Sequence, residues 1–249
     1  MNKFVNPSFS KSILGIAQAY GGLEFWLENL ADGMNPDATW RALLVIGCLK
    51  EARLAELARP LLNSDDSRVR AWACFALGQF NDVISLGQIS AMKDDPSGRV
   101  RVHARQAVQA IVSTKKSFHH SPTRMPVHES LILISEDGED TRARLTCLCS
   151  EVGLVVRTAS TERETVELAL ELRPQAIITD NQKDRDNLSG LNMVWDLCRR
   201  PELRETIILM FTADFVEPIF LWNGGDYFFS KFLNTTRDIA CVLTEYLCH

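Results

Sequence analysis

The chain has 249 residues, of which 46% are hydrophobic and 24% charged, and a formal net charge of −5. This length accommodates one large domain or two ordinary ones, and the acidic balance gives no electrostatic reason to expect non-specific binding of nucleic acid. No apolar run approaches the roughly 20 residues of a membrane helix, and residues 1–22 lack the features of a signal peptide. We therefore expect a cytoplasmic protein with neither a nucleic-acid nor a membrane partner.

The N-terminal part of the chain has a helical hydrophobic pattern. Residues 11–30 are predicted to form one helix, whose Phe25 and Trp26 pack on the end of the helices that follow. Such an end helix is expected where an apolar face would otherwise meet water.

A pattern of helix pairs then repeats. Three segments align without gaps at a spacing of 31, namely residues 39–47, 70–78 and 101–109. A small residue recurs at one place in each segment (Ala42, Ala73 and Ala104), which suits the close crossing of neighbouring helices. Second helices are predicted over residues 51–62 and 83–92. Their apolar residues are Leu54, Leu57, Ala58 and Leu61 in the first and Ile84, Leu86 and Ile89 in the second. A fixed period of this kind predicts a solenoid.

Residues 66–71 and 96–102 resemble the beginning of HEAT repeats of the short bacterial type. The resemblance covers residues 37–112 and implies an all-α HEAT-like solenoid over residues 1–113 that binds an unidentified protein target along one surface. Some short bacterial repeats attach bilin pigments, so an enzymatic or pigment-handling role is a further hypothesis. Four arginines at the repeat starts are expected either to be solvated and form salt bridges to neighbouring repeats, or to form a ridge that binds a partner: Arg68, Arg70, Arg99 and Arg101.

Residues 114–128 are predicted to be a linker. They contain Ser, Thr, Lys, His and two prolines without a sustained period. The linker separates the solenoid from a second domain over residues 129–249.

In this second domain, short apolar runs alternate with amphipathic segments. The expected strands are residues 131–134, 154–158, 176–179, 207–211 and 226–229, and the expected helices are residues 141–151, 161–172, 191–200, 217–222 and 235–247. Five βα units predict a doubly wound parallel sheet.

Polar residues follow four of these strands. Glu136 and Asp137 follow the first strand, Asp180 the third, Thr212 the fourth and Lys231 the fifth. Because ligands of such sheets bind beyond the carboxyl ends of the strands, we expect these side chains to converge there. Close carboxylates repel one another unless a cation lies among them, and oxygen ligands suit Mg²⁺.

These residues, in this order, resemble the response-regulator receiver family. The resemblance implies a flavodoxin-like (βα)5 fold in which Glu136, Asp137 and Asp180 hold Mg²⁺. It also implies that Asp180 accepts a phosphoryl group, that Thr212 binds its oxygen and that Lys231 pairs with the phosphate. The donor would be a histidine kinase or a phosphotransfer protein. The protein would not be an enzyme beyond its own phosphotransfer and dephosphorylation.

The segment departs from the family pattern in places. Phe232 occupies the position after the lysine where the family usually has proline. Phe228 occupies the position of the family's switch aromatic residue, and it lacks the hydroxyl group of the tyrosine found there in many receivers. The acceptor loop, residues 181–189, is longer than usual and carries Asp184 and Asp186, although Gly190 matches the family glycine. An alternative is therefore a pseudo-receiver adaptor that binds proteins without phosphorylation.

Overall fold

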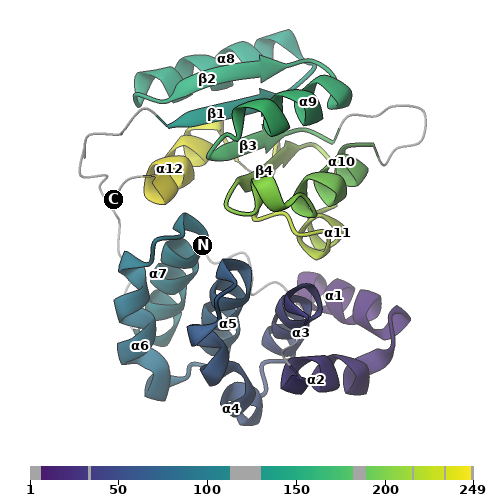
Figure 1. Cartoon of the computed structure of the whole chain (residues 1–249), viewed down its shortest axis with the longest axis vertical. Coiled ribbons are helices and arrows are strands. Elements are labelled where there is room, and N and C mark those ends of the chain that lie inside the picture. Colours follow the sequence, from purple (N-terminus) through teal and green to yellow (C-terminus); the bar gives the residue numbers. More distant parts are fainter. Residues whose placement is uncertain are drawn as a thin grey trace. The chain divides into compact units, whose positions relative to one another are not determined.

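The structure is a computed structural model that describes residues 7–32, 35–112, 130–181, 189–214, 216–232 and 234–247. The chain divides into two compact units, Met1–Ser121 and Pro122–His249 (Figure 1). This division falls within the predicted linker, whose residues 114–128 lie outside the described part. Residues 113 and 129 lie outside it as well, so the predicted domain boundaries stay predictions.

The first unit is an all-α solenoid with a regular spacing. Its principal helices are α3 (Pro36–Leu49), α5 (Ser67–Gln79) and α7 (Gly98–Val112), and their first residues, at positions 36, 67 and 98, are 31 apart. Asn35 and Asp66 cap α3 and α5 by accepting hydrogen bonds from backbone N–H groups of the first turn. Neighbouring principal helices pack directly on one another, as the period predicts.

The N-terminal segment departs from its prediction as a single helix. It forms α1 (Pro7–Ala19) and α2 (Gly22–Asp32), because Gly21 and Gly22 adopt φ angles of 131° and 76° that end one helix and allow a turn into the next. Trp26 is buried as expected, whereas Phe25 is 42% exposed.

The second helices of the repeats are also shorter than predicted. Both are broken into single turns, and Pro60, which has no N–H to donate, lies in the first of them. Two apolar residues of these predicted helices, Leu57 and Ile84, are 38% and 78% exposed. Ile84 lies in a 3-10 turn, whose side chains do not follow the α-helical spacing. The turns are η2 (Ala52–Leu54), α4 (Ala55–Ala58), η3 (Arg59–Asn63), η4 (Val83–Ser85), α6 (Leu86–Ala91) and η5 (Met92–Asp94).

Ion pairs and hydrogen bonds join neighbouring repeats at the helix starts. The Arg70 guanidinium donates to both oxygens of Asp95, at 3.0 and 2.9 Å, and also to the carbonyl oxygens of Ser64 and Asp65. Arg101, one period later, donates to the equivalent carbonyls, those of Asp95 and Pro96. The expected salt bridge to a neighbouring repeat is thus present for Arg70, whereas the expected solvation is wrong for Arg99 and Arg101, which are 1% and 4% exposed.

The second unit has a five-stranded parallel sheet in the order β2-β1-β3-β4-β5. This is the flavodoxin-like order, so the predicted (βα)5 doubly wound fold is confirmed. The central strands are almost wholly buried, whereas the edge strand β2 is largely exposed. The strands are β1 (Leu131–Ser135), β2 (Val155–Ala159), β3 (Ala176–Thr179), β4 (Ile207–Thr212) and β5 (Tyr227–Ser230).

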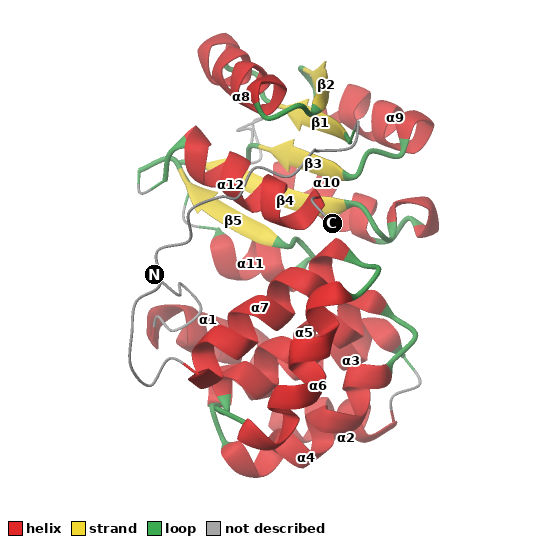
Figure 2. Ribbon diagram, turned by 90° about the vertical axis from the view of Figure 1, so that its left-hand side faces the viewer, coloured by secondary structure: helices red, strands yellow, loops and turns green. Residues whose placement is uncertain are grey.

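Helices cover both faces of this sheet (Figure 2). Helices α8 and α12 pack together on one face, and α9, α10 and α11 lie on the other. The bounds are α8 (Glu139–Glu151), α9 (Glu162–Leu172), α10 (Ser189–Cys198), the single turn η6 (Pro201–Leu203), α11 (Glu217–Trp222) and α12 (Thr236–Leu247). Among the described residues of the whole chain, no helix is both long and apolar enough to span a membrane.

Candidate functional site

The candidate site lies where the strand order of the sheet reverses. Strand β1 pairs with β2 on one side and β3 on the other, and this reversal is the usual ligand position in such folds. Glu136 and Asp137 follow β1, and Asp180 follows β3. The N–H of Asp180 donates to the Ser135 carbonyl at 3.1 Å, which fixes the end of β3 beside the end of β1.

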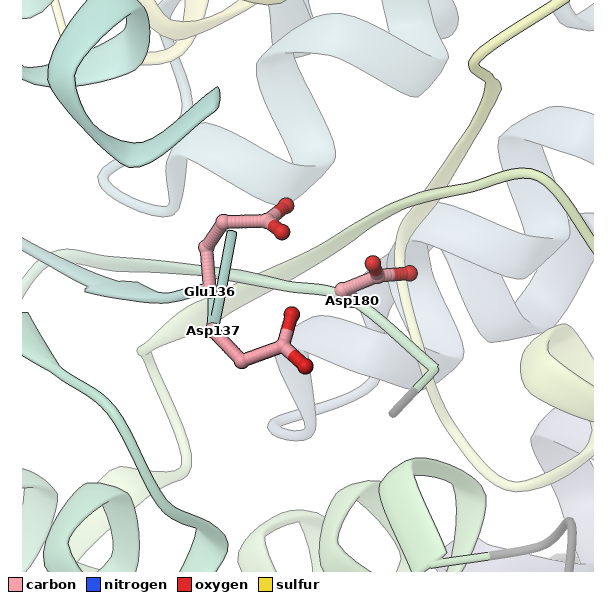
Figure 3. Close-up of side chains that lie close together, drawn as sticks. All are labelled: Glu136, Asp137 and Asp180. Atoms are coloured by element: carbon pink, nitrogen blue, oxygen red, sulfur yellow. The ribbon is translucent and has the colours of Figure 1, made fainter. Parts of the chain in front are cut away.

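The three predicted carboxylates converge. One oxygen from each of Glu136, Asp137 and Asp180 lies within 4.8 Å of the other two, and the three side chains lie close together (Figure 3). Glu136 is 3% exposed, Asp180 is half-buried and Asp137 is exposed. The set therefore has a buried wall and an open side.

Lys231 joins two of these carboxylates. Its Nζ donates to Asp180 Oδ2 at 2.6 Å and to Glu136 Oε2 at 2.9 Å. Its backbone N–H donates to the Thr212 carbonyl at 2.8 Å, so the lysine extends from the β4–β5 side of the sheet to β1. The ammonium also lies 5.5 Å from the centroid of the Phe211 ring, a cation–π distance.

Burial and hydrogen bonding have opposite effects on the pKa of Glu136 and on that of Lys231, and a different effect is the stronger one in each residue. Burial raises the pKa of the Glu136 carboxyl above its ordinary value of 4.5, and the hydrogen bond from Lys231 only partly opposes this effect. For Lys231, burial acts to lower the pKa, but the hydrogen bonds to Asp180 and Glu136 outweigh it and the pKa lies above 10.5. Lys231 therefore carries its charge at neutral pH.

The donor set fits a hard divalent cation. Among the residues that the structure describes here, three carboxylates lie close together and one ammonium pairs with two of them, so these groups together retain excess negative charge. Carboxylate oxygens are the ligands that Mg²⁺ prefers, and a cation among them would reduce their mutual repulsion.

Thr212 is the last residue of β4 and is buried. Its Oγ1 accepts a hydrogen bond from the N–H of Asp214 at 3.3 Å. The hydroxyl proton is thereby left to donate to another group. The structure thus places all five predicted residues at one edge of the sheet, although their chemical roles stay predictions.

Two further polar residues join this edge and were not predicted as site residues. Asn181 follows Asp180 directly, and its N–H donates to Asp180 Oδ1 at 2.6 Å. The Asn181 side-chain amide donates to Asp214 Oδ2 at 2.9 Å. Asn181 and Asp214 could have been predicted from the same sequence signal as the other site residues, because both are polar and follow a buried strand closely.

Glycine is required at position 190, where the first turn of α10 passes close to the backbone of Asp180 and Asn181. A Cβ atom there would lie 2.7 Å from the Asp180 carbonyl oxygen and 2.9 Å from the Asn181 Cα. Both are backbone atoms, so a side chain would displace the helix. Asp184 and Asp186, in the same loop, lie outside the described residues.

The loop after Lys231, which differs from the family pattern, is closed by hydrogen bonds between Ser230 and Asn234. The loop lacks proline, but Asn234 Oδ1 accepts from the Ser230 N–H at 3.1 Å while the Asn234 N–H donates to the Ser230 carbonyl at 2.9 Å. Phe232 is 69% exposed beside the lysine. Phe228 is half-buried, and its ring centroid lies 6.2 Å from that of Phe220 in α11.

Comparison with known proteins gives a different relative for each unit. Residues 23–109 match the sequence model of HEAT repeats. No curated protein matches the chain. Among solved structures, the Vibrio cholerae chemotaxis protein CheY4 is similar over 48% of this chain and 100% of its own, with 20% identity and a TM-score of 0.44.

Two other solved structures are similar over the same half. The signal receiver domain of a signal transduction histidine kinase from Syntrophus aciditrophicus has 25% identity and a TM-score of 0.42, with 47% of this chain and 89% of that chain covered. The response regulator domain of Thermotoga maritima CheB has 23% identity and a TM-score of 0.40, with 48% and 94% covered. The fold assignment itself depends on the strand order and parallel pairing of this chain's own sheet.

Proposed function

We propose that this chain is a response regulator of two-component signal transduction, in which Asp180 accepts a phosphoryl group from a histidine kinase or a phosphotransfer protein. The observation that carries the proposal is the position of Lys231, whose ammonium bridges Asp180 and Glu136 at the switch point of the sheet. A carboxylate nucleophile beside a fixed cation is the arrangement that attack on an anionic phosphate requires.

The proposed step transfers phosphorus without any change of oxidation state. An oxygen of Asp180 forms a bond to phosphorus, and the bond from phosphorus to the donor's imidazole nitrogen breaks, with its electron pair staying on nitrogen. Lys231 remains charged and balances the added negative charge, and the Thr212 hydroxyl donates to a phosphoryl oxygen. The product is an aspartyl phosphate.

Glu136, Asp137 and Asp180 would hold Mg²⁺. When bound, the cation shields the negative charge of the incoming phosphoryl group. The proposal treats the protein as a phosphoacceptor rather than as an enzyme acting on other molecules, and it includes the cytoplasmic location expected from the sequence.

The solenoid unit is the proposed output. HEAT-like repeats stack into extended surfaces that suit the binding of a protein. Phosphorylation of Asp180 would change the affinity of this surface for its target by shifting the equilibrium between two states of the chain.

Labelling by radioactive acetyl phosphate tests the acceptor. With Mg²⁺ present, the wild-type chain should take up phosphate, and Asp180→Asn should take up none because an amide is not a nucleophile toward phosphorus. Asp140→Asn, the same change at an exposed carboxylate of α8, is the matched control and should be labelled like wild type. Equal labelling of wild type and Asp180→Asn would refute Asp180 as the acceptor.

The alternative is an adaptor that binds proteins without phosphorylation, which the exposed Phe232 beside Lys231 favours. Beryllofluoride with Mg²⁺ separates the two functions. A phosphoacceptor should show NMR chemical-shift changes at Thr212 and Lys231, whereas an adaptor should show none.

A further inference from the structure

The loops that follow β3 and β4 are joined by a hydrogen bond between side chains. The Asn181 Nδ2 donates to Asp214 Oδ2 at 2.9 Å, and the acceptor is a carboxylate, so this is a charge-assisted hydrogen bond. The Asn181 backbone N–H donates to Asp180 Oδ1 at 2.6 Å. The N–H of Asp214 in turn donates to Thr212 Oγ1 at 3.3 Å. An unbroken series of contacts therefore links the proposed acceptor, Asp180, to the proposed phosphoryl-binding hydroxyl.

The sheet itself does not supply this link. The β3–β4 ladder ends with the pair Thr179 and Met210, before either residue of the proposed reaction is reached. Beyond that pair β4 continues alongside β5, where Thr212 is paired with Ser230. The Asn181–Asp214 bond thus takes over where the ladder between the two strands stops.

The Asn181 side chain is held tightly in place. The residue is 4% exposed, and a Cβ at Gly190 would lie 3.1 Å from its Oδ1. That Oδ1 has no hydrogen-bond partner among the described residues, which costs stability compared with an apolar side chain. The carbonyl end of the amide is therefore not used by the described residues, and the contact that the amide does make is its donation to Asp214.

We propose that Asn181 and Asp214 are positioning residues, whose hydrogen bond sets the Thr212 hydroxyl at the distance from Asp180 that lets both engage one phosphoryl group. This inference rests on the proposed phosphoryl transfer to Asp180. Neither residue exchanges a bond or a proton with the phosphoryl group. Their effect acts through Thr212, and removal of the Thr212 hydroxyl should therefore abolish it.

A double-mutant cycle on the full chain tests this inference. The initial rate of phosphorylation by acetyl phosphate with Mg²⁺ is measured for Asn181→Ala, Asp214→Ala and the double variant. Each single variant should lose about tenfold, as expected for one charge-assisted hydrogen bond, and the double variant should lose no more than either. In a Thr212→Val background, which starts from a lower rate, the same changes should have no further effect.

A variant in which the two side chains are exchanged tests whether restoring the hydrogen bond restores the rate. Asn181→Asp combined with Asp214→Asn keeps the net charge and restores the bond with donor and acceptor reversed, so most of the lost rate should return. If the buried Asn181→Ala variant fails to fold, Asp214→Ala at its half-buried position and the exchange variant carry the test.

The outcomes separate the inference from the proposed function. Losses that add in the double variant, or that persist unchanged in the Thr212→Val background, would overturn the positioning role while leaving Asp180 as acceptor. Wild-type rates in Asn181→Ala, Asp214→Ala and the double variant would do the same. A wild-type chain that takes up no more phosphate than Asp180→Asn would overturn both the positioning role and the proposed function.

Discussion

At the scale of single residues, an ion pair of the solenoid joins Arg59 to Asp82. The guanidinium Nε and Nη2 donate to the two carboxylate oxygens at 3.0 and 2.8 Å, and the Ser85 hydroxyl donates to the same carboxylate. Asp82 is 7% exposed, and the hydrogen bond from Arg59 lowers the pKa of its carboxyl below the ordinary 3.8. The ionised carboxylate of Asp82 is therefore more stable, relative to its protonated form, in the folded protein than in the unfolded chain.

Replacement of Asp82 by Asn should show the sign of this linkage. Because the folded pKa lies below the unfolded one, the ion pair stabilises fully above the unfolded value of about 3.8 and is lost as the pH falls through the folded pKa. Asp82→Asn should thus lower the melting temperature by about 4 °C at neutral pH. Denaturant titrations at decreasing pH should show the difference from wild type shrinking.

The exposed Asp94→Asn serves as the control for this pH series and should stay close to wild type throughout. A difference between Asp82→Asn and wild type that is as large in strong acid as at neutral pH would contradict the ionised pair as its cause.

At the scale of elements, the 31-residue period has a visible packing cause. A Cβ at Gly47 would lie 2.6 Å from the Phe75 ring, and one at Gly78, a period later, would lie 2.8 Å from the Ala107 Cα. Glycine therefore lets α3 approach α5, and α5 approach α7. The next position in the series is Gln109, which is exposed on α7, and no further solenoid helix follows α7 among the described residues.

Gly78→Ala should consequently destabilise the solenoid. The atom that the new methyl group meets belongs to the backbone, so the helices must separate, at a cost of about 2 kcal/mol. Gly87→Ala in α6 is the matched control, because nothing lies within 4 Å of its Cβ, and alanine there should stabilise by roughly 0.5 kcal/mol. Urea unfolding of both variants checks the contrast, and a Gly78→Ala variant as stable as Gly87→Ala would contradict it.

At the scale of the whole molecule, the two units have separate cores. Each has its own set of buried helices or strands, and the chain divides between Ser121 and Pro122. Separate cores favour separate unfolding transitions, because cooperativity spreads through packed contacts.

Ligand binding should reveal that separation. Mg²⁺ with beryllofluoride binds only the folded second unit under our proposal, so it should raise one calorimetric transition by mass action, equivalent to about 2.7 kcal/mol at a hundredfold excess over the dissociation constant. The solenoid transition should not move, and Asp180→Asn should remove the shift. A single transition that moves as a whole would show instead that the two units unfold together.

Local patterns in the sequence sufficed to predict much of this molecule. The principal solenoid helices follow from the 31-residue period, and the five strands follow from short apolar runs, to within about one residue at most ends. The site residues Asp180 and Thr212 could be proposed because parallel strands bring their carboxyl ends to one edge. Each of these features depends on neighbours in the chain and on a general rule of topology.

Other features were decided only in three dimensions. The sharing of Lys231 between Asp180 and Glu136 and the bond from Asn181 to Asp214 join residues 33 to 95 positions apart. Such contacts depend on strand register and loop path, which leave no periodic signal in the sequence. The exposure of Ile84 was decided in the same way, because residues 83–85 form a 3-10 turn rather than the start of the predicted α-helix, and the side chains of a 3-10 turn do not follow the α-helical spacing.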